Sequence, residues 1–199
     1  MWRVRYFNHN RVPKFALPIL VATLVLFGYY GDWFVAAKKV VVRSDPGLYS
    51  VAYFVDGDTL AVKMNGKVEK VRFIGVDTPE TKKPNSPVQC YGHEASDFTK
   101  TLVGNQKVRL VSDPQSTDRD RYDRLLRYVY LPDGRMVEEE TIKNGYGFAY
   151  VQFPFTKSDE FSGLQARAKS TSKGLWGKCQ PYQESSGRWQ TEDLPDAPT

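Results

Sequence analysis

Hydrophobic and polar residues alternate over three successive stretches in the first half of the chain. These stretches cover residues 49–55, 59–64 and 67–76, and Asn65-Gly66 between the last two is typical of a two-residue hairpin turn. A period of two along the chain predicts strands that bury one face. We therefore predict a three-stranded meander in which the first and third strands end at the same edge of the sheet.

The pattern downstream predicts two further strands and three helices. Apolar residues recur at helical spacing in three segments that each stop at a glycine, namely residues 92–103, 136–144 and 158–173. Strand patterns cover residues 107–112 and 124–131. These elements predict a mainly β protein of the α+β class, a five-stranded barrel of the oligonucleotide/oligosaccharide-binding (OB) kind with three helices.

A membrane-targeting helix is predicted ahead of the barrel. Residues 1–14 are basic, and residues 15–30 form an uncharged apolar run interrupted by one proline. Positive charge before this run predicts a cytoplasmic N-terminus and an exported remainder. Trp33 and Phe34 are typical of the membrane interface, which favours a retained anchor over residues 15–35 and a single-pass membrane protein with an extracytoplasmic domain. The alternative is a cleaved signal that leaves a secreted protein.

Composition divides the chain into four segments. Residues 1–37 hold the basic leader with the anchor or signal, and residues 38–47 form a linker. The folded domain is predicted over residues 48–180. Residues 181–199 are rich in Ser, Pro, Asp and Glu, and they are predicted to be disordered.

The charged residues and the number of cysteines and histidines limit which partners, metals and catalytic groups the domain can use. The chain has a formal net charge of +5, but the predicted domain holds 20 basic and 17 acidic side chains, and its net charge of +3 is weak support for a polyanionic partner. Two cysteines and two histidines are too few for the usual nitrogen and sulfur ligands of zinc. Any metal should therefore be hard and bound by oxygen, and catalysis should depend on carboxylates.

The two cysteines flank the predicted helices. Cys90 precedes the first helix and Cys179 follows the last. In an exported domain they are predicted to form a disulfide that holds the C-terminal helix on the barrel. In a cytosolic domain both would be free thiols.

Acidic side chains gather where the predicted strands end. Asp56-Gly57-Asp58-Thr59 connects the first two strands, and Asp77 and Glu80 follow the third, with Arg72 a few residues back on that strand. Simple hairpins would place these groups at one edge of the sheet. A buried cluster of carboxylates needs a cation or an arginine to offset its charge. Each piece alone is also compatible with an ordinary turn or an Arg-Asp pair.

Three motifs occur in an order and spacing that resemble the staphylococcal nuclease (thermonuclease) family. They are Asp56-Gly57-Asp58-Thr59, residues 72–80 and Asp120-Arg121-Tyr122-Asp123-Arg124, and the similarity extends from about residue 49 to residue 176. The resemblance implies a Ca²⁺-dependent phosphodiesterase on an OB-fold barrel, an endonuclease that cuts DNA and RNA and leaves 3′-phosphates. No protein partner is predicted, and the protein is expected to be a monomer.

The resemblance assigns roles to the acids. By position in the motifs, Asp58 and Asp77 are similar to side-chain metal ligands, and the carbonyl of Thr78 is similar to a third protein oxygen. Glu80 resembles the general base, or the group that orients the attacking water. Asp56 resembles a further acid close to the metal. Hard oxygen ligands of this kind suit calcium and leave room for water and substrate.

The resemblance assigns substrate binding to arginines and tyrosines. Arg72 and Arg124 are similar to two phosphate-binding arginines, a role that suits a planar guanidinium which donates bidentately and stays charged. Arg121 and Tyr122 resemble the residues that meet the terminal phosphate of the substrate. Tyr150 resembles an aromatic residue expected after the second helix.

The chain departs from the family pattern at three places. Asp123 stands where glycine is common, and Arg121 stands where lysine is more usual. The alignment after the second helix slips by one residue, which makes Tyr146 an alternative to Tyr150. The acids and arginines are all present, and this favours an active enzyme over an inactive nucleic-acid-binding module tethered to a membrane. A third hypothesis is a tethered binding domain unrelated to nucleic acid.

Overall fold

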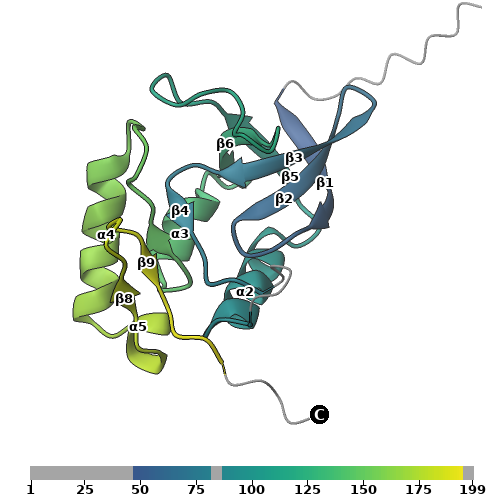
Figure 1. The fold of residues 1–199 in the computed structure, drawn as a ribbon. Coiled ribbons are helices and arrows are strands. Elements are labelled where there is room, and N and C mark those ends of the chain that lie inside the picture. The colour runs from purple at the N-terminus through teal and green to yellow at the C-terminus, as the bar shows by residue number, and fades with distance from the viewer. Residues whose placement is uncertain (1–46, 82–86, 195–199) are drawn as a thin grey trace, which may run out of the picture. The chain divides into compact units, whose positions relative to one another are not determined.

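The structure is a computed structural model that describes residues 47–81 and 87–194 (Figure 1). The predicted leader, the anchor and nearly all of the linker lie outside the described residues and stay predictions. Within the described ranges, no helix has both the length and the apolar character needed to cross a membrane.

A closed barrel of five strands forms the centre of the fold. Its strands are β1 (Leu48–Phe54), β2 (Thr59–Met64), β3 (Lys67–Phe73), β5 (Lys107–Val111) and β6 (Leu125–Tyr130), in the order β1-β2-β3-β6-β5. β3 and β6 run parallel, and the other neighbouring pairs are antiparallel. The prediction of an OB-fold barrel is confirmed.

The three predicted helices are present and pack through apolar side chains. They are α2 (Gly92–Val103), α3 (Val137–Lys143) and α4 (Ser158–Ser170), and a short helix that was not predicted, α5 (Leu175–Lys178), follows them. One buried cluster joins the helices to the barrel, and it includes Val71, Phe73, Val103, Ile142 and Phe161. Burial of these side chains fixes the helices against the strands that lead to the acidic loops.

The third strand ends earlier than its pattern predicts. Alternation predicts a strand up to residue 76, but β3 ends at Phe73 and the chain turns at Gly75, where φ is +72°. The next strand, β4 (Val76–Asp77), pairs with β7 (Phe148–Ala149) outside the barrel. The prediction is wrong here because both segments bury apolar side chains, and the turn between them depends on a glycine that alternation does not register.

A disulfide joins Cys90, just before α2, to Cys179, just after α5. Of the two alternatives predicted for these cysteines, a disulfide or two free thiols, the structure therefore shows the disulfide. Glu192 lies close to both sulfur atoms, so the three residues form a tight group of metal-ligand types. Disulfide sulfurs lack the thiolate that binds a metal, and the role of this group is structural.

Residues 182–194 fold back onto the domain, and we call them the C-terminal strap. The strap contains a hairpin of β8 (Tyr182–Gln183) and β9 (Trp189–Gln190), drawn in yellow-green to yellow in Figure 1. The ring of Trp189 lies 5.2 Å from that of Trp176 and 6.3 Å from that of Phe148. The prediction of a disordered tail is therefore wrong up to residue 194, because isolated aromatic residues anchor a segment of otherwise polar composition.

Candidate active site

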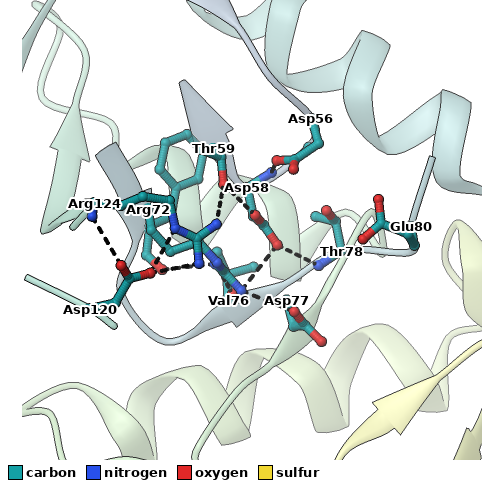
Figure 2. A network of polar contacts seen from close by, with 12 residues as sticks. Asp56, Asp58, Thr59, Arg72, Val76, Asp77, Thr78, Glu80, Asp120 and Arg124 are labelled. Carbon is teal, nitrogen blue, oxygen red and sulfur yellow. Dashed lines mark hydrogen bonds and ion pairs between the residues drawn. The ribbon is translucent and has the colours of Figure 1, made fainter. Parts of the chain in front are cut away.

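Arg72 lies at the centre of a polar network at the edge of the barrel where β2 begins and β3 ends (Figure 2). Its Nη2 is 3.1 Å from Asp58 Oδ2 and 3.0 Å from Asp77 Oδ1. Its Nη1 donates to the carbonyls of Phe73 at 3.0 Å and Val76 at 2.6 Å. The corner between β3 and β4 therefore fixes the guanidinium, which in turn brings the two aspartates together.

The loop between β1 and β2 presents Asp58. The Asp58 carboxylate accepts hydrogen bonds from the Thr59 hydroxyl at 2.9 Å and from the backbone N–H of Thr78 at 3.1 Å. The backbone N–H of Asp58 donates to Asp56 Oδ1 at 3.1 Å. A Cβ added at Gly57 would lie 2.8 Å from Thr78 Oγ1, so the two acidic loops are in direct contact only because residue 57 has no side chain.

Glu80 lies beside Thr78, at the end of the network opposite Arg124 in Figure 2. Its backbone N–H donates to Gln89 Oε1 at 2.8 Å, and its carboxylate accepts the N–H of Thr81 at 3.0 Å. The side chain is half-buried. These backbone contacts hold Glu80 next to the aspartates but offset from them.

Arg124 forms the other end of the network and is oriented by Asp120. Its Nε and Nη2 both lie 2.7 Å from Asp120 Oδ2, and its Nη1 is 3.5 Å from the hydroxyl of Thr59. Asp120 Oδ1 accepts the backbone N–H groups of Tyr122 at 2.9 Å and Arg124 at 3.0 Å. Asp120 had no assigned role in the third motif, although an Asp whose side chain accepts the backbone N–H two residues on is typical of this kind of turn.

The loop that carries Tyr122 tolerates the unusual Asp123. Asp123 has φ +62°, a conformation that Asp adopts more readily than most residues. The ring of Tyr122 is 64% exposed, with the guanidinium of Arg121 at 4.8 Å and that of Arg124 at 5.4 Å. Asp123 therefore takes the backbone conformation expected of a glycine, and the Tyr122 ring reaches solvent.

The backbone of Tyr150 lies against the corner between β3 and β4. The backbone N–H of Tyr150 donates to the carbonyl of Gly75 at 2.8 Å, at the corner that carries Asp77. Tyr146 instead stacks on Phe98 of α2, with ring centroids 4.1 Å apart. The geometry favours Tyr150 as the aromatic residue beside the site.

Burial, together with neighbouring carboxylates, raises the pKa values of two acids in the network. Burial, followed by the charge of Asp58, raises the pKa of Asp56 to about 8. Burial also raises the pKa of Asp77, against the opposing charge of Arg72. Buried carboxylates that are costly to ionise gain from a nearby cation, and carboxylate and carbonyl oxygens in such a place fit a hard divalent cation.

Comparisons with known proteins agree with this arrangement. A family model described as staphylococcal nuclease homologue matches residues 70–178. Thermonuclease from Staphylococcus hyicus is 47% identical over 129 residues, which cover 64% of this chain and 75% of that relative. The chain belongs to the staphylococcal nuclease family.

Two other relatives extend the comparison. Thermonuclease from Staphylococcus intermedius is 45% identical over 170 residues, which cover 83% of this chain and 96% of that relative. Endonuclease YncB from Bacillus subtilis (strain 168) is 48% identical over 126 residues, which cover 62% of this chain and 59% of that relative. The predicted family and the predicted class of enzyme, a nuclease, are confirmed.

One contact in the site involves a residue beyond the C-terminal end of the family match, which covers residues 70–178. Nε of Arg188, in the strap, lies 2.8 Å from Asp77 Oδ2. Arg188 was missed because the resemblance seen in the sequence ends at about residue 176 and the strap is polar and without periodicity. The neighbouring Trp189, an apolar anchor in a polar segment, was the available signal.

Proposed function

We propose that this protein is a calcium-dependent nuclease that hydrolyses phosphodiester bonds of DNA and RNA and leaves 3′-phosphates. The convergence of Asp58 and Asp77 on Arg72, with Glu80 and Arg124 at the two ends of the same network, carries the proposal. The relatives named thermonuclease and endonuclease support the same reaction.

Asp58, Asp77 and the carbonyl of Thr78 would hold the calcium ion. Once bound, the ion supplies positive charge to the phosphoryl oxygens and makes a bound water easier to ionise. Calcium takes about six to eight oxygen ligands, so three protein oxygens leave positions for water and substrate. Asp56, which accepts a hydrogen bond from the backbone N–H of Asp58, lies beside these ligands.

Arg72 and Arg124 would bind the scissile phosphate. Two backbone carbonyls hold Arg72, and Asp120 holds Arg124, so both guanidiniums are oriented before substrate arrives. Donors fixed in advance stabilise the negative charge that develops on the phosphoryl oxygens. Glu80, offset from the aspartates, would take a proton from the attacking water or orient it.

Arg121, Tyr122 and Tyr150 would bind the nucleotide on either side of the scissile bond. The exposed ring of Tyr122 offers a flat face beside two guanidiniums. Aromatic rings combined with positive charge bind single strands without strong sequence preference. This pairing supports action on both DNA and RNA.

The proposed location is outside the cytoplasm, with residues 15–35 as a membrane anchor. The disulfide between Cys90 and Cys179 supports an oxidising compartment. Secretion after cleavage of the leader is the alternative, and the protein is proposed to act as a monomer. N-terminal sequencing of the mature protein separates the two locations: an intact N-terminus supports the anchor, and a start near residue 38 contradicts it.

The reaction is tested by substituting the acid and the arginine at the two ends of the network. In the full chain in a non-ionic detergent, Glu80→Gln and Arg124→Ala should each lower the rate of calcium-dependent cleavage of single-stranded DNA by about 10² to 10⁴. The rate is measured with calcium, with magnesium and with a chelator.

Arg135→Ala is the matched control. Arg135 is an exposed arginine paired with Asp133, and neither residue belongs to the network. Its removal should leave cleavage unchanged. Equal rates in Glu80→Gln and the parent protein would refute the role assigned to Glu80. Cleavage that persists in chelator would refute the requirement for a metal ion.

A further inference from the structure

Asp77 is the one proposed ligand whose two carboxylate oxygens each face a different guanidinium in the described part of the chain. Oδ1 lies 3.0 Å from Nη2 of Arg72, and Oδ2 lies 2.8 Å from Nε of Arg188. Asp77 is buried, with 8% of its surface exposed. A divalent cation that binds this carboxylate must therefore approach an oxygen that already accepts from an arginine.

The two arginines differ in how firmly they are held. Arg72 donates to two backbone carbonyls as well as pairing with Asp58, and its side chain is 12% exposed. Arg188 pairs with Asp77 through one nitrogen, and its side chain is 39% exposed. Arg188 is therefore the one that can leave, and Oδ2 is the oxygen that its departure opens.

The strap keeps Arg188 at this place. Trp189 packs against Trp176, and the Thr191 hydroxyl, which is completely buried, donates to the carbonyl of Cys90 at 2.8 Å. The backbone N–H of Cys90 in turn donates to the carbonyl of Glu192 at 2.8 Å. The backbone on the C-terminal side of Arg188 is thus anchored, so its guanidinium has a high local concentration at Asp77.

We propose that Arg188 is a cation built into the chain that competes with calcium for Asp77. The guanidinium occupies Oδ2 in the ion-free enzyme and is displaced when the ion binds, so the strap lowers the affinity of the site for calcium. This inference rests on the proposed function, because it takes Asp77 as a metal ligand. The Arg188 guanidinium and a calcium ion at Asp77 would both be positive and would repel each other. Removal of the guanidinium should therefore raise the affinity for calcium by about tenfold or more.

The test is a calorimetric titration of calcium into the full chain in a non-ionic detergent, without nucleic acid. Arg188→Gln should lower the Kd for calcium about tenfold, because it removes the competing charge and keeps most of the side-chain volume. Arg188→Lys, which keeps the charge, should lie between Arg188→Gln and the parent. Arg135→Gln, which removes an exposed arginine from another surface, should leave the Kd unchanged.

Two further measurements make the outcome decisive. Asp58→Asn should weaken calcium binding strongly, which shows that the titrated ion occupies this site. Thermal unfolding without calcium should show that Arg188→Gln remains folded.

An unchanged or higher Kd in Arg188→Gln would overturn the inference, and a higher one would mean that Arg188 orients Asp77 for the ion. If the parent binds and cleaves with calcium while Arg188→Gln binds equally well, the inference alone fails. If the parent neither binds calcium nor cleaves with it, or if binding survives Asp58→Asn, the metal site itself fails and the inference with it.

Discussion

Glu138 is a buried acid that the proposed reaction does not use. It is completely buried at the start of α3, and both carboxylate oxygens face the backbone N–H of Val129 in β6, at 3.0 and 3.1 Å. Burial raises its pKa well above the ordinary value of 4.5. The folded protein therefore holds a proton that the unfolded chain releases once the pH exceeds that value.

This difference predicts a loss of stability with rising pH. Because the folded state binds more protons, the free energy of unfolding should fall from pH 5 to pH 8. In Glu138→Gln the fall should be smaller by at least about 1.4 kcal/mol, the equivalent of one pKa unit. Urea unfolding in the presence of a chelator, at both pH values, measures the difference.

Glu139→Gln is the control, because Glu139 is partly exposed and pairs with Lys157 at 3.3 Å. The free energy of unfolding of Glu139→Gln should change with pH nearly as it does in the parent, and more steeply than in Glu138→Gln. Identical slopes in Glu138→Gln and the parent would mean that Glu138 is ionised in the folded state.

The residues of the site differ in whether the sequence alone could place them. Asp58 and Asp77 could be brought together from the sequence because two hairpins fix which strand ends share an edge. Asp120 could not, because its role is a side-chain contact with Arg124 inside one polar loop, which no hydrophobic pattern marks. Arg188 could not, because it contacts a segment to which no hydrophobic pattern relates it. Arg188 in particular lies 111 positions from its partner Asp77.

At the scale of elements, the corner between β3 and β4 positions the site. The corner places the carbonyls of Phe73 and Val76 on Arg72 and directs Asp77 toward the same group. Gly75 makes this corner with φ +72°, and an added Cβ would lie 2.5 Å from Phe155 in the core. Residue 75 therefore allows a tight turn and close packing at once.

Gly75→Ala should damage both stability and the site. Positive φ and a clash with core rings together should cost about 2 to 4 kcal/mol in the free energy of unfolding. Denaturant unfolding measures this cost. Gly66→Ala is the comparison, because Gly66 also has positive φ but a Cβ there meets nothing within 4 Å. If the two variants lose equal stability, backbone strain rather than packing dominates at residue 75.

Elements also show why the boundary of β3 was missed and the barrel was not. The barrel follows from the number and order of strands, which alternation, turn residues and glycine stops all indicate. The break at Gly75 and the hairpin in the strap depend on partners distant in sequence, β7 for the first and Trp176 for the second. Local patterns hold no information about such partners.

At the scale of the whole molecule, the disulfide closes a loop across 89 positions. A cross-link of this span restricts the unfolded chain, and in the chain-entropy model it contributes about 4.6 kcal/mol. Cys90→Ser combined with Cys179→Ser should lower the free energy of unfolding by up to about that amount, and reductant should lower it equally in the parent. Denaturant midpoints of the oxidised parent, reduced parent and double variant measure this. If all three coincide, the contacts of the strap alone hold this side of the domain.

The order of strands in the barrel has a consequence for biosynthesis. β6 is made last of the five barrel strands, yet it lies between β3 and β5. β4 likewise pairs with β7, which is synthesised much later. A growing polypeptide that has not reached about residue 149 carries the acidic loops without the frame that aligns them. A chain that ends before this residue is therefore expected to lack an aligned site.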